Sequence, residues 1–386
     1  MNILFMMPGW NDGTGPWMLR MMEALGPDLK AIVVNDSRGE LFWKHKVPIF
    51  SVNYPPKEIH YLSRLFKLVG FSLKKNPPDA NKYLQKIIKQ FSITHVLCQY
   101  GTYAVQFLET WQKTDLQLFV HFHGYDATFD LRSYKDPERK QHNNRYLESI
   151  KTLSKRAIFI ANSEFCQNML IEGGIDPKKV EVKYIGTTIP ENAKFHEKAE
   201  GITIIQLGRL VDCKSPDRTI KAFEIAKSKG LKGTLQLVGD GPLRPTCELL
   251  QRRSEYKDSI YIFGAVDWEE GQKILSGADI FTQHNIEGEL THQSEAFGVS
   301  ILEAMSFGLS VVCSRHGGVV ESVVDGGTGI MFEPGDVEAQ ADAFLKLATD
   351  PDLRQQMGNL GRKRVAEVFS VEREAQKLRE IIEYQH

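Results

Sequence analysis

Short apolar runs separated by amphipathic stretches recur along the whole chain. In the first half they are NILFMM, KAIVV, THVLCQY, LQLFVHF and RAIFIAN, and in the second half ITIIQLG, TLQLVG, SIYIFG, ADIFTQ, LSVVCS and TGIMF. Each run has the length of a buried strand, and a helical pattern follows it. This alternation is typical of parallel sheets covered by helices on both faces, so we predict an α/β chain with two doubly wound, Rossmann-like domains.

A polar segment without a clear period separates the two halves. It reads IPENAKFHEKAEG, residues 189–201, and it directly precedes the run ITIIQLG. We place the hinge there, with a first domain over residues 1–189 and a second over residues 201–370. Residues 371–386 predict one more amphipathic helix with no strand after it, and we expect this helix to pack back on the first domain.

The composition is that of an ordinary globular protein, with 386 residues of which 42% are hydrophobic and 25% charged. The net charge of −1 argues against a protein that binds nucleic acid through bulk charge. Five cysteines without a CxxC pair or a zinc spacing indicate reduced thiols. Neither a signal peptide nor a membrane span is recognisable, so we expect a cytoplasmic location.

The charge is unevenly spread, because residues 1–100 contain 13 basic and 7 acidic side chains, a net of +6. Within them, residues 61–75 (YLSRLFKLVGFSLKK) mix four basic side chains with leucines and phenylalanines. This mixture suits a helix that lies on an anionic membrane surface, which would make the protein peripheral to the inner face of the membrane. A helix that faces the protein core and has one basic, solvated side explains the segment equally well.

The stretch SEAFGVSILEAMSFGLSVV carries two glutamates eight positions apart in a nearly all-apolar run. We expect a short helix over residues 299–307 that ends at Gly308, followed by a buried strand. Glu303 is then interior. Burying a carboxylate without a partner costs several kcal/mol, so Glu303 requires a hydrogen-bonding partner or a ligand.

The segment GRLVDCKSP follows the first strand of the second domain. Ser215 predicts a helix N-cap and Pro216 the first helical turn. Arg209 and Lys214 flank this helix start, an arrangement suited to a phosphate or diphosphate. Two solvated loop cations are an equally good interpretation of the spacing. The next such loop, VGDGPLR, predicts only a tight turn.

Ligands of open parallel sheets collect beyond the carboxyl ends of the strands. His123 lies at such an end, in HFHGYD, although a hydrogen-bonded core histidine is the common alternative. Gly15 follows the first strand and keeps side chains away, but the G-x-G-x-x-G spacing of a dinucleotide fingerprint is missing there. The triplet from Asp350 to Asp352 is better explained by helix capping than by metal binding, so no metal site is expected.

Taken in order, these motifs resemble the retaining glycosyltransferases of the GT-B fold in family 4, the glycosyl transferases group 1. HGYD matches the histidine motif of the family, GRLVDCKSP its phosphate-binding loop, and SEAFGVSILEAMSFGLSVVCSRHGG its two glutamates with a trailing Gly-Gly. NSEFCQNMLIEGGIDPKKVEV, VGDGPLR and IFGAV match segments between them. The resemblance covers nearly the whole chain, and it implies two Rossmann-like domains that face each other across a cleft.

The resemblance also implies a role for each candidate residue. Arg209 and Lys214 would hold the diphosphate of a nucleotide sugar and neutralise the charge that grows as the glycosidic bond breaks. Glu303 would accept hydrogen bonds from the ribose hydroxyls, and Glu295 would contact the transferred sugar. The other implied residues are His123 as a further catalytic residue, Gly264, Ala265 and Val266 around the nucleobase, Phe297, Gly298 and Val299 near the phosphates, and Gly15, which approaches the donor from the first domain.

By the same resemblance the protein is a retaining hexosyltransferase that needs neither a metal nor a cofactor besides its UDP- or GDP-sugar. The implied acceptor is a glycan or a lipid-linked acceptor in the synthesis of cell-surface polysaccharide or glycolipid. The sequence departs from the family pattern at YIGTT, residues 184–188, where an Asn-Gly turn is usual, and at Gly298, where many members have proline. These departures concern the hinge and the sugar preference rather than the charged groups.

Three other classes of protein share part of this pattern. A nicotinamide oxidoreductase needs a glycine fingerprint and an acidic residue about 20 residues later, and neither half provides that pair convincingly. A non-catalytic, two-lobed sugar-binding protein would normally be exported and would not require Arg209, Lys214 and Glu303 together. A sugar-nucleotide epimerase or a glycogen-type phosphorylase has the same architecture and stays an alternative, although the sequence identifies no pyridoxal-binding lysine.

Overall fold

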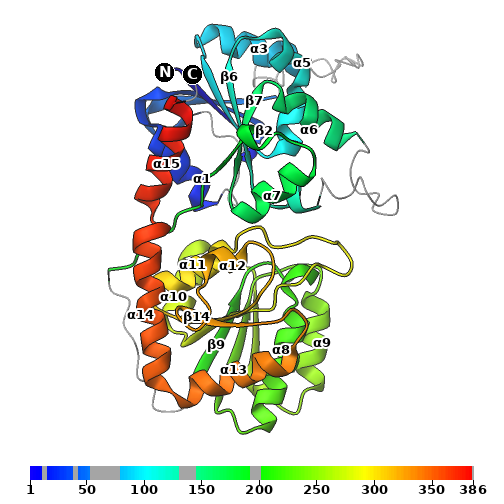
Figure 1. Cartoon of the computed structure of the whole chain (residues 1–386), viewed down its shortest axis with the longest axis vertical. Coiled ribbons are helices and arrows are strands. Elements are labelled where there is room, and N and C mark those ends of the chain that lie inside the picture. The colour runs from blue at the N-terminus through cyan, green and yellow to red at the C-terminus, as the bar shows by residue number, and fades with distance from the viewer. Residues whose placement is uncertain (11–14, 38–41, 53–78, 130–144, 192–200, 385–386) are drawn as a thin grey trace, which may run out of the picture. The chain divides into compact units, whose positions relative to one another are not determined.

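The computed structural model describes residues 1–10, 15–37, 42–52, 79–129, 145–191 and 201–384. The chain divides into two compact units (Figure 1). Unit 1 consists of Met1–Ala161, Gln167–Lys183 and Ala375–His386, and unit 2 of Asn162–Cys166 and Tyr184–Glu374. The basic and apolar segment at residues 61–75 lies outside the described residues.

In its described part, unit 1 contains one sheet with the strand order β3-β4-β2-β1-β5-β6-β7-β8. Neighbouring strands are parallel except for the antiparallel pair β3 and β4. The strands are β1 Ile3–Trp10, β2 Leu29–Ser37, β3 Phe42–Trp43, β4 Val47–Ser51, β5 His95–Gln99, β6 Gln117–Phe122, β7 Ala157–Ala161 and β8 Val180–Val182. The helices are α1 Pro16–Leu25, α3 Ala80–Gln90, α4 Gly101–Ala104, α5 Leu108–Lys113, α6 Tyr146–Ser154, α7 Glu164–Glu172 and α15 Val371–Tyr384.

Unit 2 contains an all-parallel sheet with the order β11-β10-β9-β12-β13-β14. Its strands are β9 Ile202–Leu207, β10 Gly233–Val238, β11 Ile260–Gly264, β12 Ile280–Gln283, β13 Ser310–Ser314 and β14 Gly329–Phe332. Its helices are α8 Pro216–Ser228, α9 Arg244–Arg253, α10 Trp268–Ser276, α11 Val299–Ser306, α12 Val319–Ser322, α13 Val337–Thr349 and α14 Pro351–Val368. Helices α8, α9 and α13 contribute to one apolar core with the sheet strands (Figure 1).

All eleven apolar runs singled out in the sequence form strands, which confirms the predicted doubly wound architecture. The sequence pattern missed β3, β4 and β8. Strand β3 has two residues, β8 has three with a glutamate in the middle, and β4 contains Pro48. Such strands are too short or too irregular to show an apolar run, and their place at or next to a sheet edge requires none.

In both sheets the direction of strand addition reverses beside the first strand. The chain of unit 1 moves from β1 outward through β2 and β4 and then returns to β5 on the other side of β1. The chain of unit 2 moves from β9 through β10 to β11 and returns to β12 on the other side of β9. Ligands of open α/β sheets bind at such switch points. Functional residues are therefore expected in the loops after β1, β5, β9 and β12.

The long segment of unit 2 starts at Tyr184, five residues before the polar segment in which the sequence places the hinge. The Tyr184 ring stacks on Phe297 with 5.3 Å between centroids and meets Phe369 edge-on at 5.2 Å. Thr187 forms a parallel bridge with Ser370. Aromatic packing and backbone pairing thus hold these residues to unit 2, a contact that local polarity does not reveal.

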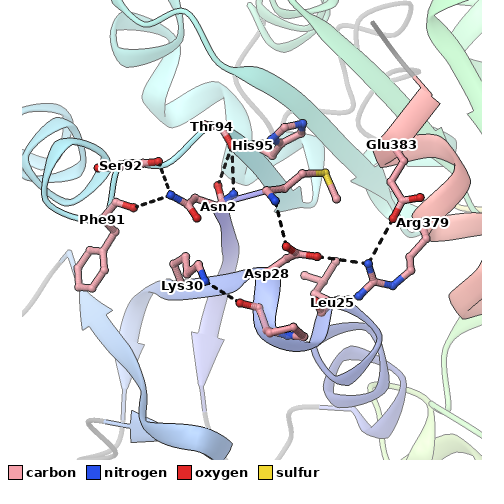
Figure 2. A network of polar contacts seen from close by, with 12 residues as sticks. Asn2, Leu25, Asp28, Lys30, Phe91, Ser92, Thr94, His95, Arg379 and Glu383 are labelled. Carbon is pink, nitrogen blue, oxygen red and sulfur yellow. Dashed lines mark hydrogen bonds and ion pairs between the residues drawn. The ribbon is translucent and has the colours of Figure 1, made fainter.

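Helix α15 is attached to unit 1 by apolar and ionic contacts. Its buried residues in the core of that unit are Leu378, Ile381 and Ile382. On the polar side, the Asp28 carboxylate accepts hydrogen bonds from the Met1 amino group at 3.0 Å and from Arg379 at 3.3 Å (Figure 2). Burial alone would raise the pKa of Asp28, but these two cations lower it below its ordinary value. Helix α15 thus ends the chain as part of the core of unit 1.

The cysteine thiols and the lengths of the described helices bear on two expectations from the sequence. All five cysteines are free and buried. Burial raises the pKa of Cys213 and of Cys313 to about 12, so these thiols are poor nucleophiles at neutral pH. None of the helices within the described ranges combines the length and the apolar character that a bilayer span requires.

Helix α14 approaches the end of α11 closely because one of its residues lacks a side chain. A Cβ atom on Gly358 would lie 1.8 Å from the carbonyl oxygen of Gly308. One turn later on the same helix, a Cβ atom on Gly361 would have Met305 Cγ as its nearest neighbour, at 3.4 Å. Gly358 therefore permits the close approach, whereas Gly361 has room for a methyl group.

We expect Gly358→Ala to lower the free energy of unfolding by about 1 to 3 kcal/mol, the range for overpacking a core. The matched control Gly361→Ala should be neutral or stabilising by up to about 1 kcal/mol, because alanine is the better helix former. Urea unfolding followed by circular dichroism measures both changes. Equal effects of the two substitutions would contradict the packing argument.

Candidate functional site

The loops after β11, β10, β9 and β12 form a row along the carboxyl edge of the unit 2 sheet, because these strands are neighbours in that order. With the start of α11, these loops carry ten of the twelve residues singled out in the sequence. The other two, His123 and Gly15, belong to unit 1. Arg209, Lys214, Glu295 and Gly15 thus follow strands at the switch points, whereas His123 follows β6 and Gly264, Ala265 and Val266 follow the edge strand β11.

The loops after β9 and β10 are in direct backbone contact, which glycines permit because they lack side chains. Gly208 has φ +145°, and a Cβ atom there would lie 3.1 Å from Lys214 Nζ. A Cβ atom on Gly239 would lie 1.9 Å from the carbonyl oxygen of Gly208, and one on Gly241 would lie 2.5 Å from that of Leu210. The two glycines of VGDGPLR are therefore required by the contact between these loops, and Gly208 leaves room for the Lys214 ammonium.

Lys214 and Glu295 form an ion pair at this switch point. Lys214 Nζ lies 2.8 Å from Glu295 Oε2, and the side chains are 13% and 17% exposed, so water screens the pair little. Burial raises the pKa of Glu295, but the charges of Lys214 and Arg209 and a hydrogen bond from the Phe297 N–H outweigh it, and the net pKa is lowered. Glu295 is thus an ionised, preoriented carboxylate at neutral pH.

The Gly-Gly pair that trails the two glutamates supports the chain segment at Glu295. A Cβ atom on Gly317 would lie 2.2 Å from the carbonyl oxygen of Glu295, and one on Gly318 would lie 1.7 Å from that of Ala296. The Gly318 N–H donates to the Glu295 carbonyl at 3.0 Å. The spacing of this motif thus reflects a close backbone contact under the site.

Helix α11 starts immediately after this segment, as the sequence predicts. Phe297 is buried and stacks on Tyr184, while Gly298 occupies the N-cap position with φ +86°. Proline is restricted to φ near −65°, so the proline of related proteins would not fit this backbone conformation. Val299 begins the helix, whose first N–H groups carry partial positive charge.

Two expectations for side chains near the site are wrong. Glu303 is half-buried in α11 rather than interior, so part of its surface stays in contact with solvent. Partial exposure is what a carboxylate that binds a soluble ligand requires. Ser215 precedes α8 but has a left-handed backbone conformation, and its hydroxyl donates to the Asp212 carbonyl at 2.8 Å instead of capping the helix.

The remaining unit 2 candidates range from exposed to buried, and Gly264 is buried. Arg209 is exposed, and among the described residues no carboxylate forms an ion pair with it. Gly264 ends the edge strand β11 with φ +76°, and its carbonyl accepts the Gly239 N–H at 2.8 Å. Ala265 is exposed and Val266 half-buried. Arg209 is available for the phosphate end of a nucleotide, and the accessible residues Ala265 and Val266 after β11 are available for its base.

In unit 1, His123 lies within a cluster of aromatic side chains. Its ring centroid is 4.5 Å from that of Trp17 and 4.7 Å from that of Tyr100. Gly15 is the N-cap residue of α1, and a Cβ atom there would lie 2.5 Å from Trp17 Nε1. Gly15 thus allows the Trp17 indole to fold back beside the helix start.

A single amide oxygen sets the proton positions of both histidines in HFHGYD. Gln99 Oε1 lies 2.8 Å from His123 Nε2 and 3.2 Å from His121 Nδ1. With this amide orientation both histidines must donate, which leaves His123 Nδ1 as an acceptor without a partner among the described residues. Burial and then the charge of Lys183 hold the pKa of His123 well below its ordinary range. His123 is therefore neutral at neutral pH.

Asp126, the last residue of HGYD, fixes the backbone of this loop. Its carboxylate accepts the N–H groups of Gly101 at 2.9 Å, His123 at 3.0 Å and Gly124 at 3.1 Å. Burial raises the pKa of Asp126 to about 6, although these N–H donors favour the ionised form. Asp126 was part of the motif in the sequence, but its role depends on Gly101, which lies after a different strand.

Sequence reasoning missed Gln99 and Asp212, which hold His123 and the Lys214 loop through contacts with distant residues. Glutamine and aspartate are common at strand ends and in turns, so the sequence alone does not distinguish Gln99 and Asp212 from other polar residues there. Three or more metal-ligating side chains do not come together anywhere in the described ranges. The chemistry that the described residues offer is ionic and hydrogen-bonding.

Comparison with known proteins places this site in a family context. Residues 188–364 match the family described as Glycosyl transferases group 1. The chain is 26% identical over 242 residues to an uncharacterized glycosyltransferase of Methanocaldococcus jannaschii, and the match spans only 60% of the length of each protein. It is 25% identical over 352 residues to N-acetyl-alpha-D-glucosaminyl L-malate synthase of Bacillus anthracis, covering 82% of this chain and 86% of that protein.

The fold is that of known GT-B glycosyltransferases. The structure is similar to that of HepE from Anabaena in complex with UDP, with a TM-score of 0.76, 18% sequence identity and 99% of each chain covered. HepE is also known in complex with UDP-glucose. These similarities confirm the two-domain, Rossmann-like GT-B fold and show homology to group 1 glycosyltransferases.

We expect Lys214→Met to lower the free energy of unfolding at pH 7 by about 3 kcal/mol, because Glu295 then stays buried without its partner. The control Lys229→Met removes exposed ion pairs with Glu338 and Asp342 and should cost less than about 1 kcal/mol. Thermal and urea unfolding compare the variants.

The difference in stability between the wild type and Lys214→Met should also depend on pH. In the wild type the pKa of Glu295 is lowered below its ordinary value of 4.5, so its stabilisation is present above that value and is lost as the pH falls through the folded-state pKa. In Lys214→Met the remaining burial raises this pKa, so protonation removes the unpaired charge. The stability difference should narrow between about pH 7 and about pH 4. A difference that stays constant would show that Glu295 is not the partner that matters.

Proposed function

We propose that this protein is a retaining glycosyltransferase that moves a sugar from a UDP- or GDP-sugar to a glycan or lipid-linked acceptor. The observation that carries the proposal is the Lys214–Glu295 ion pair, 2.8 Å long, at the switch point of unit 2. It lies within residues 188–364, the region that matches Glycosyl transferases group 1. A cation and an oriented carboxylate at one point suit the diphosphate and the sugar of such a donor.

In this proposal the diphosphate lies beside Arg209 and Lys214. Negative charge grows on the diphosphate as the glycosidic bond breaks, and preorganised cations stabilise the transition state more than the ground state. The N–H groups at the start of α11, around Phe297, Gly298 and Val299, add partial positive charge. Because these groups supply positive charge where it is needed, we propose that transfer requires no metal ion.

The two glutamates bind the hydroxyl groups of the donor. Glu295 is ionised and accepts hydrogen bonds from the transferred sugar, and Glu303 accepts them from the ribose. The partial exposure of Glu303 makes it accessible for this contact. The nucleobase lies against Gly264, Ala265 and Val266, at the end of the edge strand β11.

We assign the acceptor side to unit 1. His123 is neutral and half-buried, so its ring can border a sugar without introducing charge, while its Nδ1 atom itself is buried. The stacked rings of Trp17 and Tyr100 provide apolar surface of the kind on which sugar rings pack. Gly15 keeps the start of α1 free of a side chain beside them.

A lipid-linked acceptor would require the protein to dock on the cytoplasmic face of a membrane. Residues 61–75, with four basic side chains, are the segment proposed for this contact. Each basic residue near an anionic surface contributes about 1 kcal/mol, so a few suffice for reversible attachment. A soluble glycan acceptor would not require membrane docking, whereas a lipid-linked acceptor would.

A panel of nucleotide sugars tests the proposed function. A ligand at 100 times its Kd should stabilise the folded protein by about 2.7 kcal/mol, which is visible as a rise in melting temperature. We expect UDP- or GDP-sugars to stabilise the wild type and Glu303→Ala to lose this effect while its ligand-free melting temperature stays unchanged. Glu338→Ala, an exposed site on α13, is the control. Failure of every UDP- and GDP-sugar to stabilise the wild type would overturn the proposal.

The stereochemistry of the product tests the retaining mechanism. An α-linked donor should give an α-linked product, and the anomeric coupling constant in proton NMR distinguishes the two outcomes. The same assay with EDTA should show unchanged turnover, because Arg209 and Lys214 supply the positive charge. A β-linked product would refute retention, and activity lost with EDTA and restored by Mg²⁺ would refute metal independence.

A further inference from the structure

Besides a backbone hydrogen bond from the Ile286 N–H to the Cys213 carbonyl at 3.1 Å, two side-chain contacts attach the loop between β12 and α11, residues 284–295, to the turn Asp212–Lys214. One is the Lys214–Glu295 ion pair, which is part of the proposed donor site. The other involves Asp212, to which the roles given above assign no function. The two contacts join the same two chain segments, since Asp212 lies two residues before Lys214 and Thr291 lies four residues before Glu295.

The Asp212 carboxylate is saturated by donors, three of them from the loop. Oδ2 accepts the backbone N–H groups of Leu290 at 2.9 Å and Thr291 at 2.8 Å. Oδ1 accepts the Thr291 hydroxyl at 2.8 Å and the Cys213 N–H at 2.9 Å. Hydrogen bonds to an ionised acceptor are about twice as strong as neutral ones, so this one side chain holds the loop firmly.

Beyond the Arg218–Glu289 ion pair and the backbone hydrogen bond of Ile286, the side chains of the loop do little to fix its conformation. Leu290 is 80% exposed, so its side chain provides no apolar anchor. The loop closes on itself through the bonds from Gly288 N to Gln293 O at 2.9 Å and from His292 N to Gly288 O at 2.7 Å. His292 has φ +53°, a conformation that a non-glycine residue adopts at a cost. Asp212 therefore offsets an unfavourable local conformation.

Gly288 shows how closely the carboxylate is enclosed. A Cβ atom at this position would lie 2.6 Å from Asp212 Oδ2 and 2.6 Å from Thr291 Oγ1. Both atoms are held by the hydrogen bonds described above, so neither can move away without breaking them. The glycine, the aspartate and the threonine therefore form one interlocked contact.

The other groups of the donor site are anchored independently of Asp212. Lys214 is held through its carbonyl, which accepts the Gln206 amide at 3.0 Å. The backbone of Glu295 is held by Gly318. Loss of the Asp212 contact should therefore release residues 287–293 while leaving the cations and the start of α11 in place.

We propose that Asp212 is a positioning residue that holds the loop of residues 287–293 beside the sugar end of the donor, and that this loop determines which sugar is accepted. The inference rests on the proposed function, in which Glu295 contacts the transferred sugar. The loop leads directly into Glu295 and is tied beside Lys214, so it borders the sugar rather than the nucleobase. Discrimination among sugars then depends on the Asp212 contact, and affinity for the nucleotide does not.

The test compares binding of a nucleotide with binding of its sugar conjugate. Calorimetry with UDP, UDP-glucose, GDP and GDP-mannose is carried out on the wild type, Asp212→Asn and Thr291→Val. In Asp212→Asn the amide group opposes the loop N–H donors, so affinity for the nucleotide sugar should fall about tenfold or more, while affinity for the nucleotide changes less than about twofold. Thr291→Val removes only the hydroxyl contact and should give a smaller change in the same direction.

Glu289→Gln is the matched control, because it alters the same loop but only at the exposed Arg218–Glu289 ion pair. It should leave both affinities unchanged. Equal weakening of nucleotide and nucleotide sugar in Asp212→Asn and Thr291→Val, or no weakening at all, would overturn the inference while leaving the proposed function intact. A wild type that binds none of the four compounds would overturn the proposed function itself. Thr291→Val keeps the test decisive if Asp212→Asn does not fold.

Discussion

The ion pair between Lys214 and Glu295 is the interaction on which the organisation of unit 2 depends. It joins loops from β9 and β12, neighbouring strands whose helical connections leave in opposite directions along the sheet. Two charges with so little exposure are tolerated only when they are close together and hydrogen-bonded. Three glycines leave room for the pair: Gly208 has no side chain against the Lys214 ammonium, and Gly317 and Gly318, after β13, have none against the backbone at Glu295 and Ala296. Backbone geometry and electrostatics thus impose the same arrangement.

The two units place different chemistry at the carboxyl ends of their parallel strands. In unit 2 the groups at the switch point are charged, and the surrounding N–H dipoles and cations favour an anionic ligand. In unit 1 the two histidines at the end of β6 are neutral at neutral pH, and both donate to Gln99 beside aromatic rings. An ionic site and a neutral hydrogen-bonding site suit a nucleotide-linked donor and a hydroxylated acceptor, respectively, which is the division of labour that we propose.

The sequence predicted the buried strands well because a strand covered on both faces must be apolar along its whole length. It predicted the start of α11 at Val299 and the capping role of Asp350, since both depend on neighbours within a few residues. It failed for Ser215, whose backbone adopts the left-handed conformation, and for Glu303, which is only half-buried. Both errors arose from assuming regular helix geometry and full burial where contacts between loops and the position of the helix in the fold decide.

By itself, the sequence determined the alternation of strands and helices and the loops that carry polar and charged groups. Only the tertiary structure decided which of these groups meet. Lys214 and Glu295 are 81 residues apart in the chain, and Asp212 meets Thr291 across 79 residues. Such pairs form because β12 lies beside β9 instead of continuing outward after β11. The order of strands in the sheet is a property of the packed core as a whole, and no short stretch of sequence records it.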